Sequence, residues 1–190
     1  MLLLTATLWA QKPAHATADP GRIDGGVYHN AFFGFRYKLP YGWVERTREI
    51  EGDSPNATNA AVRPLLLLTV FERPPEASGE TVNSAVVIVA EPLSSYSGMK
   101  TAADYFGPLT ELATAKGFQA VEEPHAYSLG TAQLVRGDFS KSRGTKSVRQ
   151  TSLVILEKGY ELSFTFIGEN ENEINELIEK LSFATRKPAH

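Results

Sequence analysis

Hydrophobic and polar residues alternate with a period of two in several short segments of the chain. Segment 33–39 places its apolar side chains on one face, namely Phe33, Phe35, Tyr37 and Leu39. Arg36 and Lys38 fall on the opposite face. Because successive side chains of a strand point to opposite sides, this pattern predicts a strand that is half-buried and solvated on one face.

Other segments also have the pattern of strands. The apolar runs Leu65–Phe71 and Ala85–Ala90 are short, and the second is rich in β-branched residues, which favours strands buried on both faces. Further strands are predicted at Gln119–Glu122, Ala132–Phe139, Val148–Leu156 and Tyr160–Ile167. Lys158 and Gly159 supply the turn of a hairpin between the last two.

Two segments have the three-to-four-residue period of helices. In Thr101–Lys116, Thr101 and Asp104 predict a capping box, and Pro108 predicts a kink or two short helices. We expect one buried stripe on this helix, formed by Tyr105, Leu109, Leu112 and Ala113. The segment Glu171–Leu181 follows Asn170, a good N-cap, and has a clear apolar stripe.

These elements predict one domain over residues 27–185. The chain has 190 residues, of which 42% are hydrophobic, enough for a single core of ordinary size. Because hairpins and loops join most strands, the predicted fold class is α+β. We expect an antiparallel β-sheet packed between helices, as an α/β/α sandwich. Residues 45–63 have no sustained period and are predicted to form a long loop.

The first 16 residues have the pattern of a signal peptide. Met1–Ala10 is apolar and too short to cross a bilayer, and Ala14-His15-Ala16 offers a cleavage site after Ala16. The usual positively charged start is missing, which suggests a true start upstream; the alternative is a frayed terminus of a cytoplasmic protein. We expect export to the periplasm or beyond, a linker at 17–26 and a tail at 186–190.

Composition removes several classes of function. The chain has 19 basic and 22 acidic residues, a net charge of −3, which argues against nucleic acid as a partner. It has no cysteine, which excludes disulfides, thiolate metal sites and a lipid-modified cysteine. The sequence predicts no cofactor, and leaves metal binding open.

The aromatic opening block resembles a known family. Phe35-Arg36-Tyr37-Lys38-Leu39-Pro40-Tyr41-Gly42-Trp43, with Tyr28 before it, is similar to the start of PsbP-like domains. The strand Tyr160–Ile167, the helix after it and Phe183 resemble the way those domains end. The superfamily includes photosystem II PsbP, DcrB-type envelope proteins and a Ran-binding branch. The resemblance, over residues 27–185, implies an antiparallel sheet between helices and a non-enzymatic accessory role.

Catalytic motifs are weak. His29 and His125 are the only histidines within the predicted domain, and no G-x-S-x-G nucleophile motif accompanies them. Tyr96 and Lys100 match Y-x-x-x-K, but without the glycine fingerprint of a dinucleotide site. We therefore assign no catalytic residue. A hydrolase or lyase that uses carboxylates with His29 or His125 stays an alternative, and so does a small-molecule or lipid carrier with an apolar cavity.

Two charged clusters could bind partners or ions. The acidic residues are dense near the last helix, and we interpret them as a solvated face rather than a metal site; they are Glu169, Glu171, Glu173, Glu176 and Glu179. The basic cluster Lys141, Arg143, Lys146 and Arg149 could dock an acidic protein partner, or could simply be the solvated loop of a hairpin.

Overall fold

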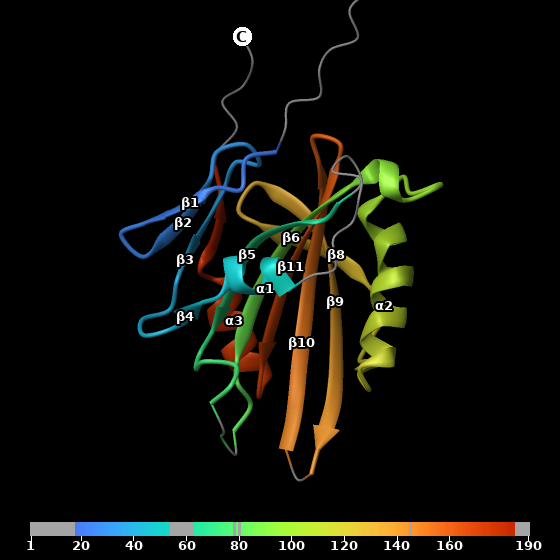
Figure 1. The fold of residues 1–190 in the computed structure, drawn as a ribbon. Coiled ribbons are helices and arrows are strands. Elements are labelled where there is room, and N and C mark those ends of the chain that lie inside the picture. Colours follow the sequence, from blue (N-terminus) through green and yellow to red (C-terminus); the bar gives the residue numbers. More distant parts are fainter. Residues whose placement is uncertain (1–17, 54–62, 78, 80, 145, 185–190) are drawn as a thin grey trace, which may run out of the picture.

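The computed structural model describes residues 18–53, 63–77, 79, 81–144 and 146–184. The chain forms a large and a small antiparallel sheet with helices packed on them (Figure 1). The small sheet has the order β1-β2-β3-β12. Its strands are β1 (Arg22–Asp24), β2 (Val27–Asn30), β3 (Phe35–Lys38) and β12 (Leu181–Phe183).

The large sheet has the order β4-β5-β6-β11-β10-β9-β7, and β8 also pairs with β9. Its strands are β4 (Val44–Glu45), β5 (Leu65–Phe71), β6 (Ala85–Pro92), β7 (Gln119–Ala120), β8 (His125–Leu129), β9 (Ala132–Arg143), β10 (Lys146–Glu157) and β11 (Tyr160–Gly168). The long strands β9, β10 and β11 are joined as consecutive hairpins. Strand β6, which precedes them in sequence, completes the centre of the sheet by pairing with β11.

One face of the large sheet carries the main hydrophobic core. The small sheet and helix α3 (Glu171–Ile178) cover this face, which we call the α3 face (Figure 1). Phe164 of β11 is fully buried there, with its ring 5.0 Å from that of Phe35 of β3. Because Leu162, Phe164 and Phe166 alternate with polar residues, β11 directs all three into this core.

Helix α2 (Phe106–Ala115) covers the opposite face, the α2 face, after the short helices η1 (Leu93–Ser95) and η2 (Ala102–Tyr105). Thr101 and Asp104 form the predicted capping box. The predicted break lies at Tyr105 and Phe106, so that Pro108 falls in the first turn of α2, where its missing N–H costs nothing. This second core contains Phe106, Leu109, Ala113, Phe139 and Val154.

The predicted α+β class and the antiparallel sheet between helices are confirmed. Other details differ from expectation. Residues 45–63 are not simply a loop, because α1 (Thr47–Asp53) begins there and packs on β5. Leu112 was expected in the buried stripe but is 58% exposed, because α2 buries only Phe106, Leu109 and Ala113.

Two further differences concern the bounds of elements. Arg22–Asp24, inside the predicted linker 17–26, pairs with β2 as a strand. The last helix ends at Ile178, so Leu181 belongs to β12. The predicted signal peptide and the tail 186–190 lie outside the described residues. No described helix is long and apolar enough to span a bilayer.

Candidate functional site

A groove of about 310 Å³ lies between α2 and the large sheet. Its floor comes from alternate residues of three strands, including Val87 and Val89 of β6 and Ile167 of β11. Leu109 and Leu112 of α2 form the wall above it. The volume lies in the range of about 300–1,000 Å³ that small-molecule sites occupy. Helix α2 therefore leaves part of the α2 face uncovered.

Titratable groups meet at one end of this groove. Glu91, near the end of β6, accepts a hydrogen bond at Oε1 from the Tyr105 hydroxyl at 2.9 Å. The Tyr96 hydroxyl donates to the other oxygen, Oε2. The two rings pack edge to face with their centroids 5.7 Å apart. Since Tyr96 follows η1 and Tyr105 ends η2, these two helical turns position both phenols over the end of β6.

A second carboxyl lies beside the first. Glu161 of β11 is directly opposite Glu91 in the antiparallel register, so both side chains point to the α2 face. Glu161 is 0% exposed, and neither of its carboxyl oxygens has a hydrogen-bond partner. Burial, and to a lesser extent the charge of Glu91, raises the pKa of Glu161 to about 9. Glu161 therefore holds a proton at neutral pH.

The tyrosines respond to the same environment. Burial, together with the nearby charge of Glu161 and Glu91, raises the pKa of Tyr105 far above its ordinary value. Burial and the hydrogen bond to Glu91 do the same for Tyr96. Both phenols therefore stay neutral and act as hydrogen-bond donors. The ion pairs formed by the described residues use other carboxylates, so the acidic end of the groove lacks a paired cation.

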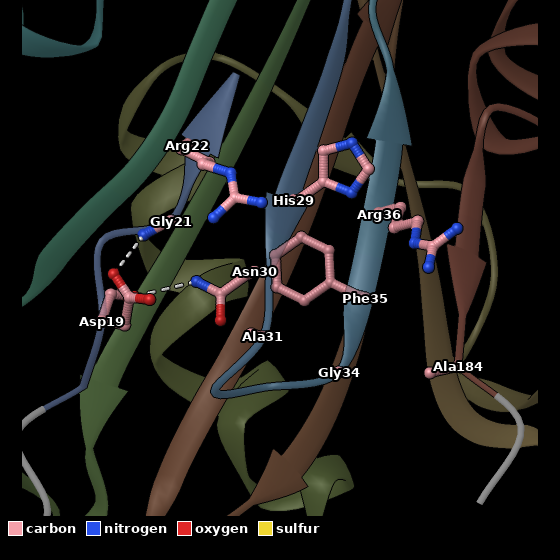
Figure 2. A pocket seen from close by; sticks show the side chains of 10 residues that line it. All are labelled: Asp19, Gly21, Arg22, His29, Asn30, Ala31, Gly34, Phe35, Arg36 and Ala184. Carbon is pink, nitrogen blue, oxygen red and sulfur yellow. Dashed lines mark hydrogen bonds between the residues drawn. The ribbon is translucent and has the colours of Figure 1, made fainter. Parts of the chain in front are cut away.

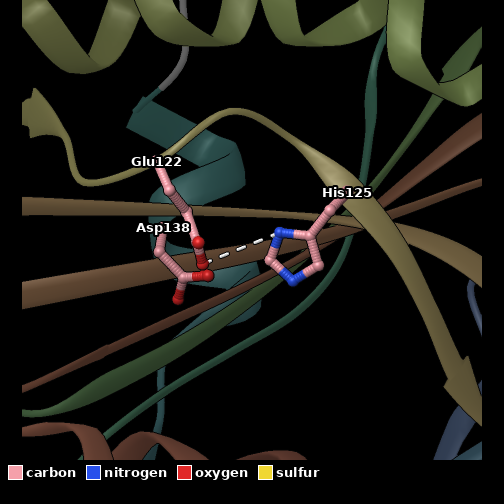
Figure 3. A group of neighbouring side chains, drawn as sticks. All are labelled: Glu122, His125 and Asp138. Atoms are coloured by element: carbon pink, nitrogen blue, oxygen red, sulfur yellow. Dashed lines mark ion pairs between the residues drawn. The ribbon is translucent and has the colours of Figure 1, made fainter.

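Glu122, His125 and Asp138 form another group of potential ligands (Figure 3). Their ligand atoms lie within 4.8 Å of one another, and His125 Nδ1 is 3.7 Å from Glu122 Oε1. Asp138 is already engaged, because Arg136 donates to it at 2.7 and 2.9 Å. Burial opposes its ionisation, but hydrogen bonds from Arg136 and Thr151 hold the pKa of Asp138 below its ordinary value. A metal ion here would compete with Arg136.

A hollow of about 420 Å³ lies against the small sheet (Figure 2). Arg22, His29 and Arg36 occupy neighbouring register positions on β1, β2 and β3, on the face turned away from the main core. Asp19 Oδ1 accepts the Gly21 amide at 3.0 Å, which turns its carboxylate away from the imidazole. The hollow is thus lined mainly by basic groups.

The hydrolase alternative required a histidine beside an acid inside a pocket. His29 lines the hollow of Figure 2 but is flanked by two arginines across the strands. His125 has acidic neighbours, but its side chain is 44% exposed and lines none of the cavities described above. Neither histidine therefore combines a position in a cavity with an adjacent acidic side chain, as the hydrolase alternative requires.

The structure places the basic cluster at the end of the β9–β10 hairpin, mostly within the strands rather than in a loop. Arg143 pairs with Lys146, and Lys141 pairs with Val148. Arg149 occupies the alternate position, on the other face of the sheet. Lys141 Nζ lies 4.4 Å from the centre of the Phe118 ring and bonds to the Lys116 carbonyl. Lys141 and Arg149 therefore lie on opposite faces of the hairpin and do not form one flat patch.

The acidic residues near α3 have mainly structural partners. Glu173 accepts hydrogen bonds from Ser84 and from the Glu169 amide, and Glu169 accepts one from the Val82 amide. Asn170 caps the helix through the Glu173 amide, as predicted. Glu171, Glu176 and Glu179 are exposed, in agreement with a solvated face.

Sequence analysis missed the acidic end of the groove. In the predicted strand Tyr160–Ile167, Glu161, Ser163 and Thr165 share the polar face, and polar faces are normally solvated. The helix that covers this face comes from residues far away in the sequence. One signal was available in the sequence. The apolar stripe of Thr101–Lys116 predicts that this helix packs on a sheet face, and that face could have been the less apolar face of β11.

Comparison with known sequences gives no direct relative. No protein-family model matches the chain, and neither does any curated protein sequence.

Solved structures are similar in fold. The solution structure of cyanobacterial PsbP (CyanoP) from Synechocystis sp. PCC 6803 matches with a TM-score of 0.52 and 14% identity, over 86% of this chain and 98% of that one. The Ran-binding protein Mog1p of Saccharomyces cerevisiae matches with a TM-score of 0.46 and 10% identity, over 79% and 90%. LpqN of Mycobacterium tuberculosis, involved in cell envelope biogenesis, matches at 0.40 and 15%, over 89% and 88%. The first of these matches shows that the chain has the PsbP-like fold. This is the fold implied by the resemblance of the aromatic opening block and of the closing strand and helix.

Proposed function

We propose that this protein is a non-enzymatic binding domain that holds a small amphiphilic molecule in the groove under α2. Cavities lined by apolar side chains with a few converging polar groups are typical of small-molecule sites. The groove combines such a lining with an acidic end formed by Glu91, Tyr96 and Tyr105, and Glu161 is buried behind Glu91.

The observation that supports this most directly is the state of the groove floor. Val87 and Val89 are only half-buried although they belong to the central strand β6, because α2 leaves space above them. On the opposite face of the same strand, Val86, Ile88 and Ala90 are fully buried. A ligand in the groove would bury the apolar surface that α2 leaves open, which is favourable by about 25 cal/mol per Å².

The test is a titration followed by two-dimensional amide NMR, with three eight-carbon probes: octyltrimethylammonium, 1-octanol and octanoate. We expect at least one probe to shift the amides of Val87, Val89, Leu109 and Leu112. In the variant Val89→Trp, the indole fills the groove and abolishes these shifts. Ile23→Trp, at a 43% exposed position on β1, is the matched control and should bind as the wild type does. Failure of all three probes would contradict the proposal.

A protein-docking role for Lys141, Arg143, Lys146 and Arg149 is a second proposal. The hairpin that carries them extends beyond the rest of the large sheet (Figure 1), where a partner could reach both of its faces. Replacing all four by Glu should abolish capture of an acidic partner in a pulldown. Unchanged capture would contradict this role.

We also propose that the protein acts outside the cytoplasm. The apolar segment Met1–Ala10 and the A-x-A pattern before residue 17 support export. Mass spectrometry of the protein purified from its native envelope fraction should find the mature N-terminus at Thr17. An intact N-terminus in the cytoplasmic fraction would contradict this.

A further inference from the structure

We propose that the ligand of the groove is an organic cation, a substituted ammonium group with a short apolar tail, and that Glu91 binds its charged head while the buried carboxyl of Glu161 lies behind it. This inference rests on the proposed binding function and specifies the chemistry of the ligand.

The two carboxyls supply the first argument. Glu91 and Glu161 occupy paired positions on neighbouring strands, and such pairs have their Cβ atoms about 4.5–5.5 Å apart. Both oxygens of Glu161 are buried without a hydrogen-bond partner. Burying a polar group without a partner is costly, and native structures rarely leave one so. Glu91 lines the groove and Glu161 is buried behind it, so a cation at Glu91 would act on the unpartnered carboxyl through its charge.

The tyrosines supply the second argument. Tyr96 and Tyr105 both line the groove, and both hydroxyls point to Glu91. Aromatic rings attract a cation placed over their faces, most strongly where water is excluded. Tyr96 is half-buried, whereas Tyr105 is buried. An ammonium head that replaces the Tyr96 hydroxyl at Glu91 would therefore lie beside the Tyr96 ring and one carboxylate, with the second carboxyl buried behind that carboxylate.

Charge along the groove fixes the orientation. Lys116 lines the groove and is exposed, at the C-terminal end of α2, whereas Glu91 and Tyr105 lie near the N-terminal end of that helix. A cationic head is repelled from Lys116 and attracted to the carboxyls. The tail then runs along Val87, Val89 and Leu109, which are apolar. An anionic ligand would bind in the reverse orientation, with its head in solvent beside Lys116.

Binding should be coupled to the ionisation of Glu161. The titratable groups that face it are Glu91 from β6, Tyr96 and Tyr105 from the segment before α2, and Lys116 farther along the groove. Burial and Glu91 raise the pKa of Glu161 to about 9, so an incoming cation must displace its proton to gain the second charge. The affinity for a permanently charged cation should therefore rise between pH 6 and pH 9.

The experiment measures the affinity of the full chain for octyltrimethylammonium, 1-octanol and octanoate by calorimetry and amide NMR. The first probe keeps its charge at every pH, so any pH dependence belongs to the protein. We expect the cation to bind about tenfold or more tightly than 1-octanol, because its charge is attracted to the Glu91 carboxylate in a partly water-excluded groove. Octanoate should bind most weakly.

Matched variants separate charge from shape. Glu161→Gln and Glu91→Gln keep the size of the side chain, and each should weaken the cation about tenfold and leave 1-octanol unchanged. Glu161→Gln should also remove the rise in affinity between pH 6 and pH 9. Glu176→Gln, at an exposed position of α3 on the other side of the sheet, is the control and should bind as the wild type does.

The outcomes distinguish the two proposals. If 1-octanol or octanoate binds in the groove as tightly as the cation, the binding function stands and the cation inference is overturned. If Glu161→Gln and Glu91→Gln both bind the cation normally, the inference is likewise overturned. If no probe reaches the groove, both proposals fail. Preference for the cation that depends on both carboxyls supports both.

Discussion

The two faces of the large sheet solve the same packing problem differently. On the packed α3 face, Phe35, Leu162, Phe164 and Phe166 are buried, and the charged Asp138 is held by Arg136 and Thr151. On the α2 face, which is open at the groove, the buried Glu161 has no partner. The difference lies in the two buried carboxyls, because Asp138 has an ion pair and a hydrogen bond and Glu161 has neither. The unpartnered carboxyl beside the groove is therefore our best indication of function.

The largest expected effect is on the packed face. Phe164→Ala removes a fully buried ring that packs edge to face with Phe35 and Phe183. We expect the free energy of unfolding to fall by about 3–5 kcal/mol, as for other buried aromatic residues. Urea denaturation measures it, and Tyr41→Ala, at a fully exposed position, is the control. A loss below about 1 kcal/mol would show that this face is not tightly packed.

The next effect is on the open face and depends on pH. The pKa of Glu161 is raised to about 9, so the folded state binds a proton that the unfolded state releases above its ordinary value. The contribution of Glu161 to the free energy of unfolding is therefore fully present below the ordinary glutamate pKa. It is lost as the pH rises toward 9, with a slope of up to about 1.4 kcal/mol per pH unit.

Glu161→Gln removes that titration. At pH 8 this variant should be more stable than the wild type by about 4 kcal/mol, and at pH 4 the difference should disappear. Thermal and urea unfolding at several pH values measure the difference. If the free energy of unfolding depends on pH in the same way in both proteins, the Glu161 carboxyl has a partner in the folded state and the account of its raised pKa is wrong.

Asp138 should show the opposite sign. Its pKa is held below the ordinary value, mainly by Arg136 against the effect of burial, so its contribution is present at neutral pH and lost as the pH falls. Asp138→Asn should cost about 1–2 kcal/mol at pH 7 and less in acid. Unfolding at pH 7 and pH 3 tests this. Equal losses at both values would rule out the ion pair as the cause.

The smallest effect on stability is expected at Leu112, which is 58% exposed beside the groove. Leu112→Ala should change the free energy of unfolding by less than about 0.5 kcal/mol, as is usual for surface positions. Its affinity for the octyl probes should still fall two- to threefold, because the tail loses part of its wall. Calorimetry measures this, and an unchanged affinity would place the tail elsewhere.

Local patterns predicted the strands and helix ends well. Segment 33–39 and Tyr160–Ile167 were recognised because their apolar residues alternate strictly, and Thr101 and Asp104 because a capping box is a local motif. Helix α1 was missed because residues 47–53 have no apolar stripe. Strand β8 was missed because it is short and its residues are mostly exposed.

The site depends on contacts that a local pattern does not contain. The pairing of Glu91 with Glu161 joins β6 to β11, strands separated in sequence by α2 and six other elements. Each of these residues looks like an ordinary polar position on its own strand. The prediction that Leu112 is buried failed because the break at Tyr105 sets which side of α2 faces the sheet.

The most direct test of the account is the titration of the Glu161 side-chain carboxyl, followed by carbon-13 NMR in the absence and presence of octyltrimethylammonium. Glu161→Gln identifies the resonance. The account predicts a pKa of about 9 in the free protein and a clearly lower pKa with the cation bound. A carboxyl that titrates near the ordinary glutamate value in the free protein, or whose titration the cation leaves unchanged, would contradict it.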